Sequence, residues 1–481
     1  MKHIHPIYIL KQLWRFWFII LLPFFQGLFS GTLEFTFYNT APTVILLAGS
    51  IWEWFCFQYQ FTADKIILRK GIFLRREKVL LKAKVSTADI DTGVFLTLLR
   101  AFQIRIDTES GSGKHPDFHF TVWKKDAVQI LHYFCGTKIN WKYRAPTWKT
   151  AAGALAFSRS APGLLLLSAA IKTGGQFLGN GFKDKVYGTV STAQTVLGQY
   201  IPPIFAGIAY LIAAGWLVSF LFLAMRQMNF HLGRAGNCLI TRKGFLVRRY
   251  SIISVPMVNA RILQQTPSMR LLGMTQVLLD CAGYGKEQGE LALLVPAEPP
   301  ACALKICAEV LPEIIEEPIT IRPPKDARMR YLAPALWWSG GLLATAVLLI
   351  IFLKKQAAFP CLILTIPFMY CMLFSIQRWN AGHDAGVSAH YLSSVSYRRL
   401  LILQVTFAKP WLQGITCEQN PFQQWQGLCH LFLFPRSEGR FHIKIKHLQA
   451  KDFPMLFPVS HPPFFYKRGK KKNTDHDICK Q

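Results

Sequence analysis

Two eight-residue stretches of the sequence follow one pattern, Arg69-Lys70-Gly71-Ile72-Phe73-Leu74-Arg75-Arg76 and Arg242-Lys243-Gly244-Phe245-Leu246-Val247-Arg248-Arg249. Each consists of a basic residue, Lys-Gly, three apolar residues and Arg-Arg. An offset of 173 residues superposes the two stretches without a gap, and the same offset aligns Asp107 with Asp280. Agreement that continues over about forty residues indicates an internal repeat.

A third copy follows the second at an offset of 154 residues. This offset places Pro256 on Pro410, Gln265-Thr266-Pro267 on Gln419-Asn420-Pro421, and Gly273 on Gly427. The hairpin position of the third copy reads Tyr397-Arg398-Arg399-Leu400 and lacks the glycine. The sequence therefore predicts three copies of one unit.

Short β-rich runs separated by turn residues dominate the unit. In the first copy they are residues 65–68, 72–74, 104–107 and 118–122. The Lys-Gly pair fits a tight hairpin turn, because glycine adopts the positive φ that such turns require. Helix-like segments close the first two copies at residues 125–134 and 301–311. Several strands followed by one helix predict a small β-barrel or β-sandwich capped by a C-terminal helix.

Long apolar segments precede each copy. Hydrophobic residues make up 51% of the 481-residue chain, and its mean hydropathy is +0.24. The predicted spans form three pairs, at residues 16–29 with 41–57, 161–178 with 204–225, and 337–353 with 358–374. We therefore expect an α+β membrane protein with six transmembrane helices, each pair followed by one β unit.

The expected domains follow from this alternation. Transmembrane pairs are placed at residues 1–59, 150–228 and 331–376, β units at 60–137, 229–318 and 377–457, and a basic tail at 458–481. Lys and Arg residues gather beside the β units, whereas residues 30–40 contain neither. The positive-inside rule then predicts a multi-pass protein of the cell membrane with both termini and all three β units in the cytoplasm.

The order of helix pair, basic hairpin, Gln-x-Pro and a later glycine resembles the bacterial membrane-flanked pleckstrin-homology-like domain family. The resemblance rests on Arg261-Ile262-Leu263-Gln264-Gln265-Thr266-Pro267 with Leu271-Leu272-Gly273, and on Ile415-Thr416-Cys417-Glu418-Gln419-Asn420-Pro421-Phe422 with Gly427-Leu428. Three copies are similar to the YdbT-like group of that family. The first copy departs from the pattern, because Ala83 replaces the proline. The resemblance implies pleckstrin-homology-like folds that recognise protein or lipid headgroups. It names no particular ligand and implies no catalytic chemistry.

Paired basic residues at the hairpins are the candidate contacts for anionic lipid headgroups or a partner protein. They are Arg69, Lys70, Arg75, Arg76, Arg242, Lys243, Arg248, Arg249, Arg398 and Arg399. The formal net charge of +29 favours anionic partners. We expect a binding or scaffolding protein at the lipid bilayer, whose three β units bind anionic lipid, one another, or a partner such as a companion membrane protein with similar domains. The competing interpretation is that these residues form a solvated strand face and only set topology.

Other functions receive less support from the sequence. Gly111-Ser112-Gly113-Lys114 lacks the flanking residues of a phosphate-binding loop and reads as a turn. His115, Asp117 and His119 alternate as metal ligands on a strand could, but the other copies do not repeat the set. No catalytic motif, cofactor site or metal site is predicted, so we expect no enzyme. The eleven cysteines lack metal-binding spacing and read as small core residues in a reducing compartment.

Two alternatives stay open. A transporter or lipid-handling membrane component would use Lys172 and Glu53 along a polar path, with the β units as regulators. Nucleic-acid binding would explain a pI of 9.8, but the positive charge is spread along the chain and forms no recognised nucleic-acid module.

Overall fold

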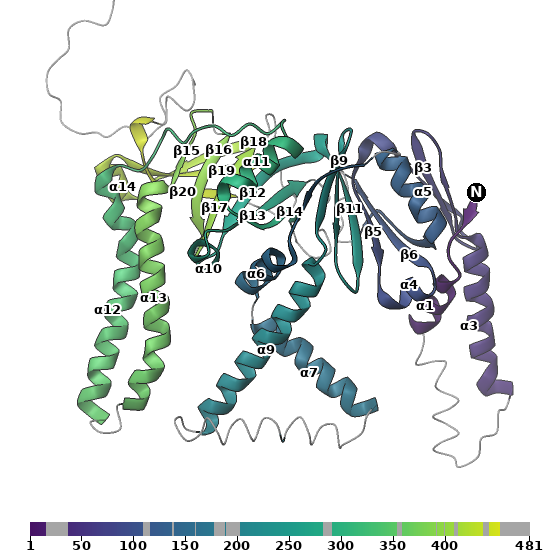
Figure 1. Cartoon of the computed structure of the whole chain (residues 1–481), viewed down its shortest axis with the longest axis horizontal. Helices are drawn as coiled ribbons and strands as arrows, with labels where there is room; N and C mark the ends of the chain where they lie inside the picture. The colour runs from purple at the N-terminus through teal and green to yellow at the C-terminus, as the bar shows by residue number, and fades with distance from the viewer. Residues whose placement is uncertain are drawn as a thin grey trace, which may run out of the picture. The chain divides into compact units, whose positions relative to one another are not determined.

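The computed structural model describes residues 1–15, 37–108, 116–136, 139–158, 160–177, 188, 203–281, 291–353, 358–390, 392–398, 400–407, 412–435 and 442–452. The chain forms two compact units. Unit one contains Met1–Asn259 and Leu272–Pro312, and unit two contains Ala260–Leu271 and Glu313–Gln481. Figure 1 labels the elements of both units.

Unit one begins with a four-stranded antiparallel sheet in the order β1-β2-β3-β4. The strands are β1 (Lys2–His3), β2 (Gln58–Phe61), β3 (Lys65–Lys70) and β4 (Arg76–Leu81). Helix α1 (Ile7–Arg15) packs against α3 (Phe37–Cys56), which also contacts β3. The hydrogen bond from Trp54 Nε1 to the Ile4 carbonyl, 2.8 Å long, fixes the end of α3 to the N-terminal strand.

A seven-stranded antiparallel sheet forms the centre of unit one, in the order β7-β6-β5-β11-β10-β9-β8. From the first copy come β5 (Val85–Thr92), β6 (Ala101–Thr108) and β7 (Phe118–Trp123). From the second copy come β9 (His231–Ala235), β10 (Cys238–Lys243) and β11 (Arg248–Ser254), and β8 (Asn140–Arg144) adds the outer edge. The two copies meet where β5 pairs with β11, from Thr92 opposite Arg248 to Thr87 opposite Ile253.

The two faces of this sheet have opposite character, because successive strand residues point to opposite sides. Ala88, Ile90, Ile104 and Ile106 share one face and are buried in the apolar core under helix α5 (Lys124–Cys135). The core also takes in Ile240 and Ile252 from the second copy. The first copy therefore shares a hydrophobic core with the hairpin of the second.

The remainder of unit one joins helices to a hairpin. The helices are α6 (Thr147–Phe157), α7 (Ser160–Phe177) and α9 (Pro203–Gln227), followed by β13 (Thr275–Cys281), β14 (Ala292–Glu298) and α11 (Pro300–Val310). Glu298 is buried at the end of β14, accepts a hydrogen bond from Tyr143 Oη at 2.8 Å and pairs with Lys149 Nζ at 2.7 Å. This contact fixes α6 against β14.

Unit two contains a strand pairing of the same kind. Strand β12 (Val258–Gln265) pairs with β17 (Leu401–Phe407), from Ala260 opposite Phe407 to Gln265 opposite Ile402. Strands β16 (Ser393–Arg398) and β15 (Gly386–Val387) continue outward from β17. Short helix α10 (Pro267–Leu271) follows β12, as α4 (Val94–Leu98) follows β5 in unit one.

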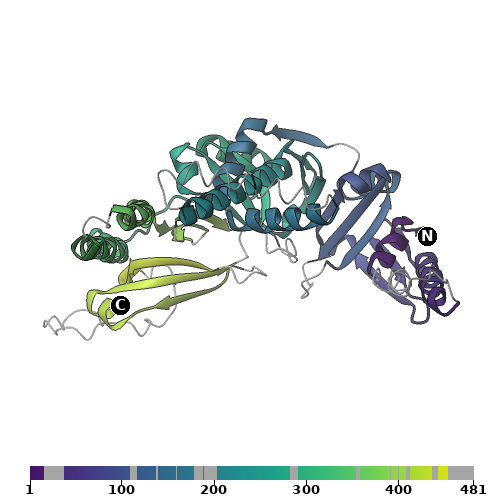
Figure 2. The same cartoon turned by 90° about the horizontal axis from the view of Figure 1, so that it is seen from below.

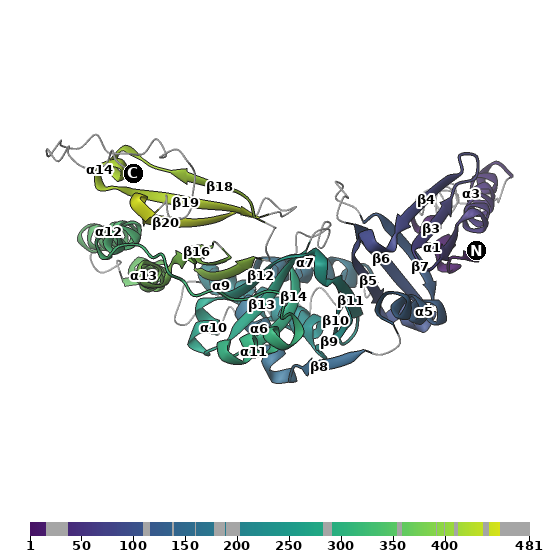
Figure 3. The same cartoon turned by 90° about the horizontal axis from the view of Figure 1, so that it is seen from above.

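Two further parts complete unit two. Helices α12 (Arg328–Leu353) and α13 (Ala358–Asp384) run side by side (Figures 1 and 3). Strands β18 (Leu412–Glu418), β19 (Leu428–Pro435) and β20 (Ile443–Gln449) form a separate three-stranded sheet, shown in yellow in Figure 2, with α14 (Pro421–Gln426) between β18 and β19.

The predicted repeat is confirmed for the first two copies at the level of single elements. The 3-10 helices Lys82–Lys84 and Val255–Met257 lie 173 residues apart, and so do the first residues of β5 and β12. The predicted helices at 125–134 and 301–311 correspond to α5 and α11. The expectation of separate barrels is wrong, because the second half of one copy pairs with the hairpin of the next. Strand patterns alone do not specify which strand edge will be the partner.

The predicted six transmembrane helices are also wrong. Among the described residues, one helix, Lys325–Leu348, is long and apolar enough to cross a membrane, or two if the bent pair Thr147–Phe157 and Pro162–Ala169 forms one span. Within α3 and α9, the apolar stretches Val44–Cys56 and Leu211–Gln227 are shorter than the roughly 20 residues needed for hydrocarbon about 30 Å thick. The prediction of a multi-pass cell membrane protein is therefore wrong as well. Much of the apolar composition is used in buried strands such as β14. The first predicted span, 16–29, lies outside the described residues.

Candidate functional site

The first basic hairpin ends in a turn, residues 71–75, that we call tip one. Its sequence pattern had predicted a strand at residues 72–74, but the structure places these residues in the turn between β3 and β4. Phe73 is 100% exposed and Leu74 is 66% exposed. Arg75 and Arg76 are exposed beside them. Tip one thus presents apolar side chains next to positive charge.

The second hairpin carries the equivalent turn, residues 244–247, which we call tip two. Phe245, Leu246 and Val247 are 58%, 49% and 50% exposed. The Phe245 amide donates a 2.9 Å hydrogen bond to the Met225 carbonyl in the last turn of α9, and the Gly244 amide donates a 2.7 Å bond to the carbonyl of Met228, the residue that follows the helix. These bonds satisfy helix-end carbonyls that would otherwise lack partners, so tip two is fixed to the end of a helix.

Glycine is required at the start of both tips. Gly71 has φ +120° and Gly244 has φ +105°, a region that other residues rarely adopt. A Cβ at Gly71 would lie 2.0 Å from the Leu74 carbonyl oxygen, and one at Gly244 would lie 1.9 Å from that of Val247. The Lys-Gly signal in the sequence therefore predicted these turns correctly.

Short helix α4 extends the apolar surface of tip two. The β5–β11 pairing sets Thr92 opposite Arg248, so the chain enters α4 at the edge where tip two turns (Figure 1). Four apolar side chains at this edge are exposed by 47–83%: Val94, Phe95, Leu98 and Leu99. The 173-residue offset also aligns Leu98-Leu99 with Leu271-Leu272, which is a sequence signal for this surface. Apolar pairs usually indicate core, so the sequence alone assigns them no function.

The ten predicted contact residues separate into two groups. Arg75, Arg76, Arg248 and Arg398 are exposed. The others contact the protein itself. Arg69 and Lys70 are also exposed, but Arg69 pairs with Glu77 and Lys70 with Glu53. Arg249 pairs with Asp91, and the Arg242 guanidinium lies over the Tyr250 ring. Lys243 is half-buried at the end of β10. Arg399 lies outside the described residues.

Arg249 belongs to a buried charge cluster on the polar face of the seven-stranded sheet. Asp91 Oδ1 lies 2.7 Å from Arg249 Nε, and Asp91 also pairs with Arg105 from β6. Asp89, on the same face of β5, is half-buried, and burial of its carboxyl raises its pKa while Arg249 acts in the opposite direction. A carboxylate between two arginines stabilises this joint, so Arg249 serves the fold.

Lys70 fixes tip one in a comparable way. Its Nζ lies 3.2 Å from Glu53 Oε1 on α3 and stands 5.7 Å and 5.5 Å from the ring centroids of Tyr8 and Phe57. Burial alone would lower the pKa of Lys70, but its contacts with Tyr8 and Glu53 outweigh burial and raise it. Lys70 therefore stays charged. Glu53, which the transporter interpretation paired with Lys172, is bound to Tyr8, Gln12 and Lys70 instead.

The described residues give no support to the metal and phosphate sites considered from the sequence. Residues 109–115, which include the Gly-Ser-Gly-Lys turn and His115, lie outside the described residues. Asp117 accepts a hydrogen bond from the Thr108 amide at 2.9 Å, and His119 contacts Gln103. Within the described ranges, no group of three or more His, Cys, Asp or Glu side chains could hold a metal ion.

Comparison with known proteins gives a family. The sequence model described as "Bacterial PH domain" matches residues 7–133 and 191–306, which together make up just over half of the chain. Searches of curated proteins and of solved structures each found no match. The third copy and the narrower YdbT-like grouping stay predictions, because the family match covers the first two copies. On the extent of this match, the chain belongs to the bacterial PH domain family.

Proposed function

We propose that the chain is a binding protein that docks on an anionic lipid surface through tip one, tip two and α4. In this account it catalyses no reaction. Its role is to hold the bacterial PH domain copies at the surface of a bilayer, where they act as a scaffold.

The observation that carries the proposal is the exposure of Phe73. A phenylalanine that is 100% exposed at the end of a hairpin gains nothing from the fold. Both tips combine this exposure with arginines immediately next to the apolar residues. Exposed apolar groups bordered by polar ones mark interaction surfaces.

Charge makes an anionic bilayer the best match. Arg75, Arg76 and Arg248 are exposed at the tips, and each basic residue near an anionic leaflet contributes roughly 1 kcal/mol. Apolar side chains then gain free energy when they leave water, about 1.5–3 kcal/mol for a phenylalanine that becomes fully buried. Basic residues would attract the protein to the surface, and the phenylalanines would enter the interface between headgroups and acyl chains.

Rigidity supports the same function. The turn geometry imposed by Gly71 and Gly244 and the contacts with α3 and α9 hold the tips before any ligand is present. A surface that is already ordered loses little conformational entropy on binding. Two tips on one chain also bind as a linked pair, so that weak individual contacts are sufficient.

Flotation of the full chain with liposomes tests the proposal. We expect binding to vesicles that contain anionic phospholipid, weaker binding as salt increases, and little binding to neutral vesicles. Binding that is equal on neutral and anionic vesicles would reject the electrostatic part. Absence of binding even at low salt would reject the function and direct the search to protein partners.

A further inference from the structure

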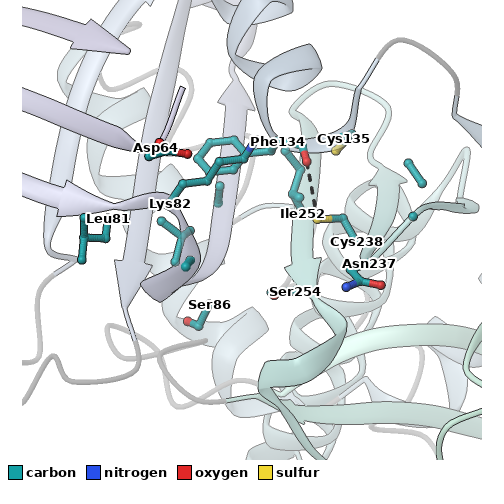
Figure 4. A pocket seen from close by; sticks show the side chains of 15 residues that line it. Asp64, Leu81, Lys82, Ser86, Phe134, Cys135, Asn237, Cys238, Ile252 and Ser254 are labelled. Atoms are coloured by element: carbon teal, nitrogen blue, oxygen red, sulfur yellow. Dashed lines mark hydrogen bonds between the residues drawn. The ribbon is translucent and has the colours of Figure 1, made fainter. Parts of the chain in front are cut away.

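A cavity of ≈ 680 Å³ opens where the first copy meets the second in unit one. Its wall includes Asp64, Lys82 and Phe134 from the first copy and Asn237 and Ile252 from the second (Figure 4). Asp64 is exposed, so the cavity reaches the surface. The docking surface described above does not use these residues.

Two cysteines, Cys135 and Cys238, line this cavity from different copies. Cys135 is the last residue of α5, and Cys238 is the first residue of β10. Cys238 Sγ donates a 3.6 Å hydrogen bond to the carbonyl of Phe134, the residue that precedes Cys135 (Figure 4). The fold therefore brings together two thiols that are about a hundred residues apart in the sequence.

The two thiols have unequal surroundings. Cys135 is 8% exposed, whereas Cys238 is half-buried at the cavity wall. The hydrogen bond between the two side chains, and then burial, raise the pKa of the Cys135 thiol. The same bond lowers the pKa of Cys238 against the opposing effect of burial, and the positive charge of Lys82 also lowers it. Cys238 is the better nucleophile, because it is the more exposed of the two thiols at the cavity wall and the charge of Lys82 favours its thiolate, which is the reactive form.

Lys82 is held in place for this role. Its Nζ stands 4.4 Å from the ring centroid of Tyr133, and the Tyr133 hydroxyl donates a 3.3 Å hydrogen bond to the Ala63 carbonyl. A fixed cation in the wall of the cavity stabilises an anion inside it, whether that anion is a thiolate or a carboxylate of an entering molecule.

We propose that Cys135 and Cys238 form a reversible dithiol site that reacts in this cavity with low-molecular-weight disulfides of the glutathione class. The Cys238 thiolate attacks one sulfur of the small disulfide. That S–S bond breaks, a mixed disulfide forms on Cys238, and one small thiolate leaves and takes up a proton. The Cys135 thiol then loses its proton, and its sulfur attacks Cys238 Sγ.

The second step forms the Cys135–Cys238 disulfide and releases the second small thiol, protonated by the proton from Cys135. Two protein thiols are oxidised and one small disulfide is reduced to two thiols. The product links α5 of the first copy to β10 of the second, beside the joint between β5 and β11. Reduction by excess small thiol reverses both steps.

Peptide mapping of the full chain tests the site. The reduced protein is incubated with oxidised glutathione, the remaining thiols are trapped with N-ethylmaleimide, and the peptides are identified by mass spectrometry. We expect a linked pair of peptides that contains Cys135 and Cys238, and its loss when reduced glutathione is added. Exposed Cys302 on α11 serves as the internal reference. Modification of Cys302 without any link between Cys135 and Cys238 would overturn the proposal.

Single substitutions separate the two roles. Cys135→Ser should stop the reaction at a glutathione adduct on Cys238, and Cys238→Ser should leave Cys135 unmodified. An adduct on Cys135 in the Cys238→Ser protein would contradict the assignment of the nucleophile. Lys82→Gln keeps both thiols and should slow modification of Cys238 relative to Cys302, which tests the site even if a cysteine variant fails to fold. An unchanged ratio of the two rates would remove Lys82 from the mechanism and contradict the proposed site.

Discussion

Arg249 Nε of the second copy and Asp91 Oδ1 of the first copy lie 2.7 Å apart across the pairing of β11 with β5. Both side chains are largely buried, at 16% and 8% exposure. An arginine that the sequence offers as a lipid contact is therefore part of the joint between two copies. The second hairpin motif therefore has two uses, since Arg249 belongs to the joint whereas the neighbouring Arg248 is exposed at tip two.

The Asp91 cluster should contribute strongly to stability. Asp91→Asn removes the carboxylate that pairs with both Arg105 and Arg249, and we expect the free energy of unfolding of unit one to fall by about 3 kcal/mol. Urea unfolding of the full chain, followed by hydrogen exchange in β5 and β11, measures the loss.

The pair between Arg69 and Glu77 is the matched control, since it also joins two adjacent strands but is exposed at 53% and 43%. Glu77→Gln should change stability by less than about 1 kcal/mol. If the two variants lose the same stability, the joint has no special role.

Glycine in the tips should be irreplaceable. Gly71→Ala and Gly244→Ala force a Cβ against a carbonyl oxygen at a φ above +100°, and each should lower the free energy of unfolding by about 1–3 kcal/mol. Gly93→Ala is the control, because φ there is −87° and no atom lies within 4 Å of the added carbon. Thermal unfolding compares the three, and a Gly93→Ala loss as large as the other two would contradict the argument.

Acid should loosen the three-stranded sheet of unit two. The rings of His430 and His447 lie 4.8 Å apart on β19 and β20. Burial, together with Lys444 and Lys446, lowers the pKa of His430 to about 4, and burial together with His430 and Arg330 lowers that of His447 to about 3. Both are therefore neutral in the folded protein near neutral pH.

The sign follows from these lowered values. Above the unfolded histidine pKa of 6.5 the folded sheet has its full stability. As the pH falls from there toward 4 and 3, the unfolded chain binds protons before the folded one does, so the free energy of unfolding decreases. We therefore expect amide hydrogen exchange in β19 and β20, corrected for the intrinsic effect of pH, to become faster as the pH is lowered from 6.5. A His430→Gln, His447→Asn double variant should show a shallower dependence. Asparagine suits position 447, where φ is +57°. The same dependence in both proteins would exclude the histidines as its cause.

Lipid docking should need the apolar residues at the tips as well as the charge. We expect the Phe73→Ser, Phe245→Ser double variant to bind anionic vesicles at least about tenfold more weakly, since each lost burial is worth more than 1 kcal/mol. Phe73→Leu with Phe245→Leu keeps most of the apolar area and should retain binding. Titration with vesicles at fixed salt measures both, and equal affinity of the serine variant and the unaltered protein would exclude insertion.

Local signals in the sequence predicted local structure well. Lys-Gly identified both hairpin turns, and the 173-residue offset predicted matching elements such as the 3-10 helices at Lys82–Lys84 and Val255–Met257. Which strand edges pair depends on contacts between residues distant in the sequence, and local patterns do not specify it. The β5–β11 joint and the cysteine pair at the cavity could therefore not be predicted. The predicted membrane spans failed for a related reason, since apolar composition does not distinguish a spanning helix from a buried strand or a short apolar helix.

Exposure was the other quantity that the sequence could not supply. Residues 72–74 read as a strand because they are apolar, yet Phe73 lies fully exposed in the turn. The ten candidate basic residues looked equivalent, but ion pairs within the protein hold Lys70 and Arg249. The distinction depends on Glu53 and Asp91, which come from elements distant in the sequence.

The most direct test of lipid docking is flotation of a charge-reversed chain beside a control with the same net charge. The test variant changes Arg75, Arg76 and Arg248, exposed at the tips, to Glu. The control changes Lys124, Lys125 and Lys305, exposed on α5 and α11, to Glu. Net charge falls equally in both variants, so any difference in vesicle binding depends on where the substituted residues lie.

We predict that the control floats with anionic vesicles nearly as well as the unaltered chain, and that the tip variant stays with the unbound protein at the same salt. If both variants lose binding to the same extent, the attraction follows net charge, and docking through the tips is wrong.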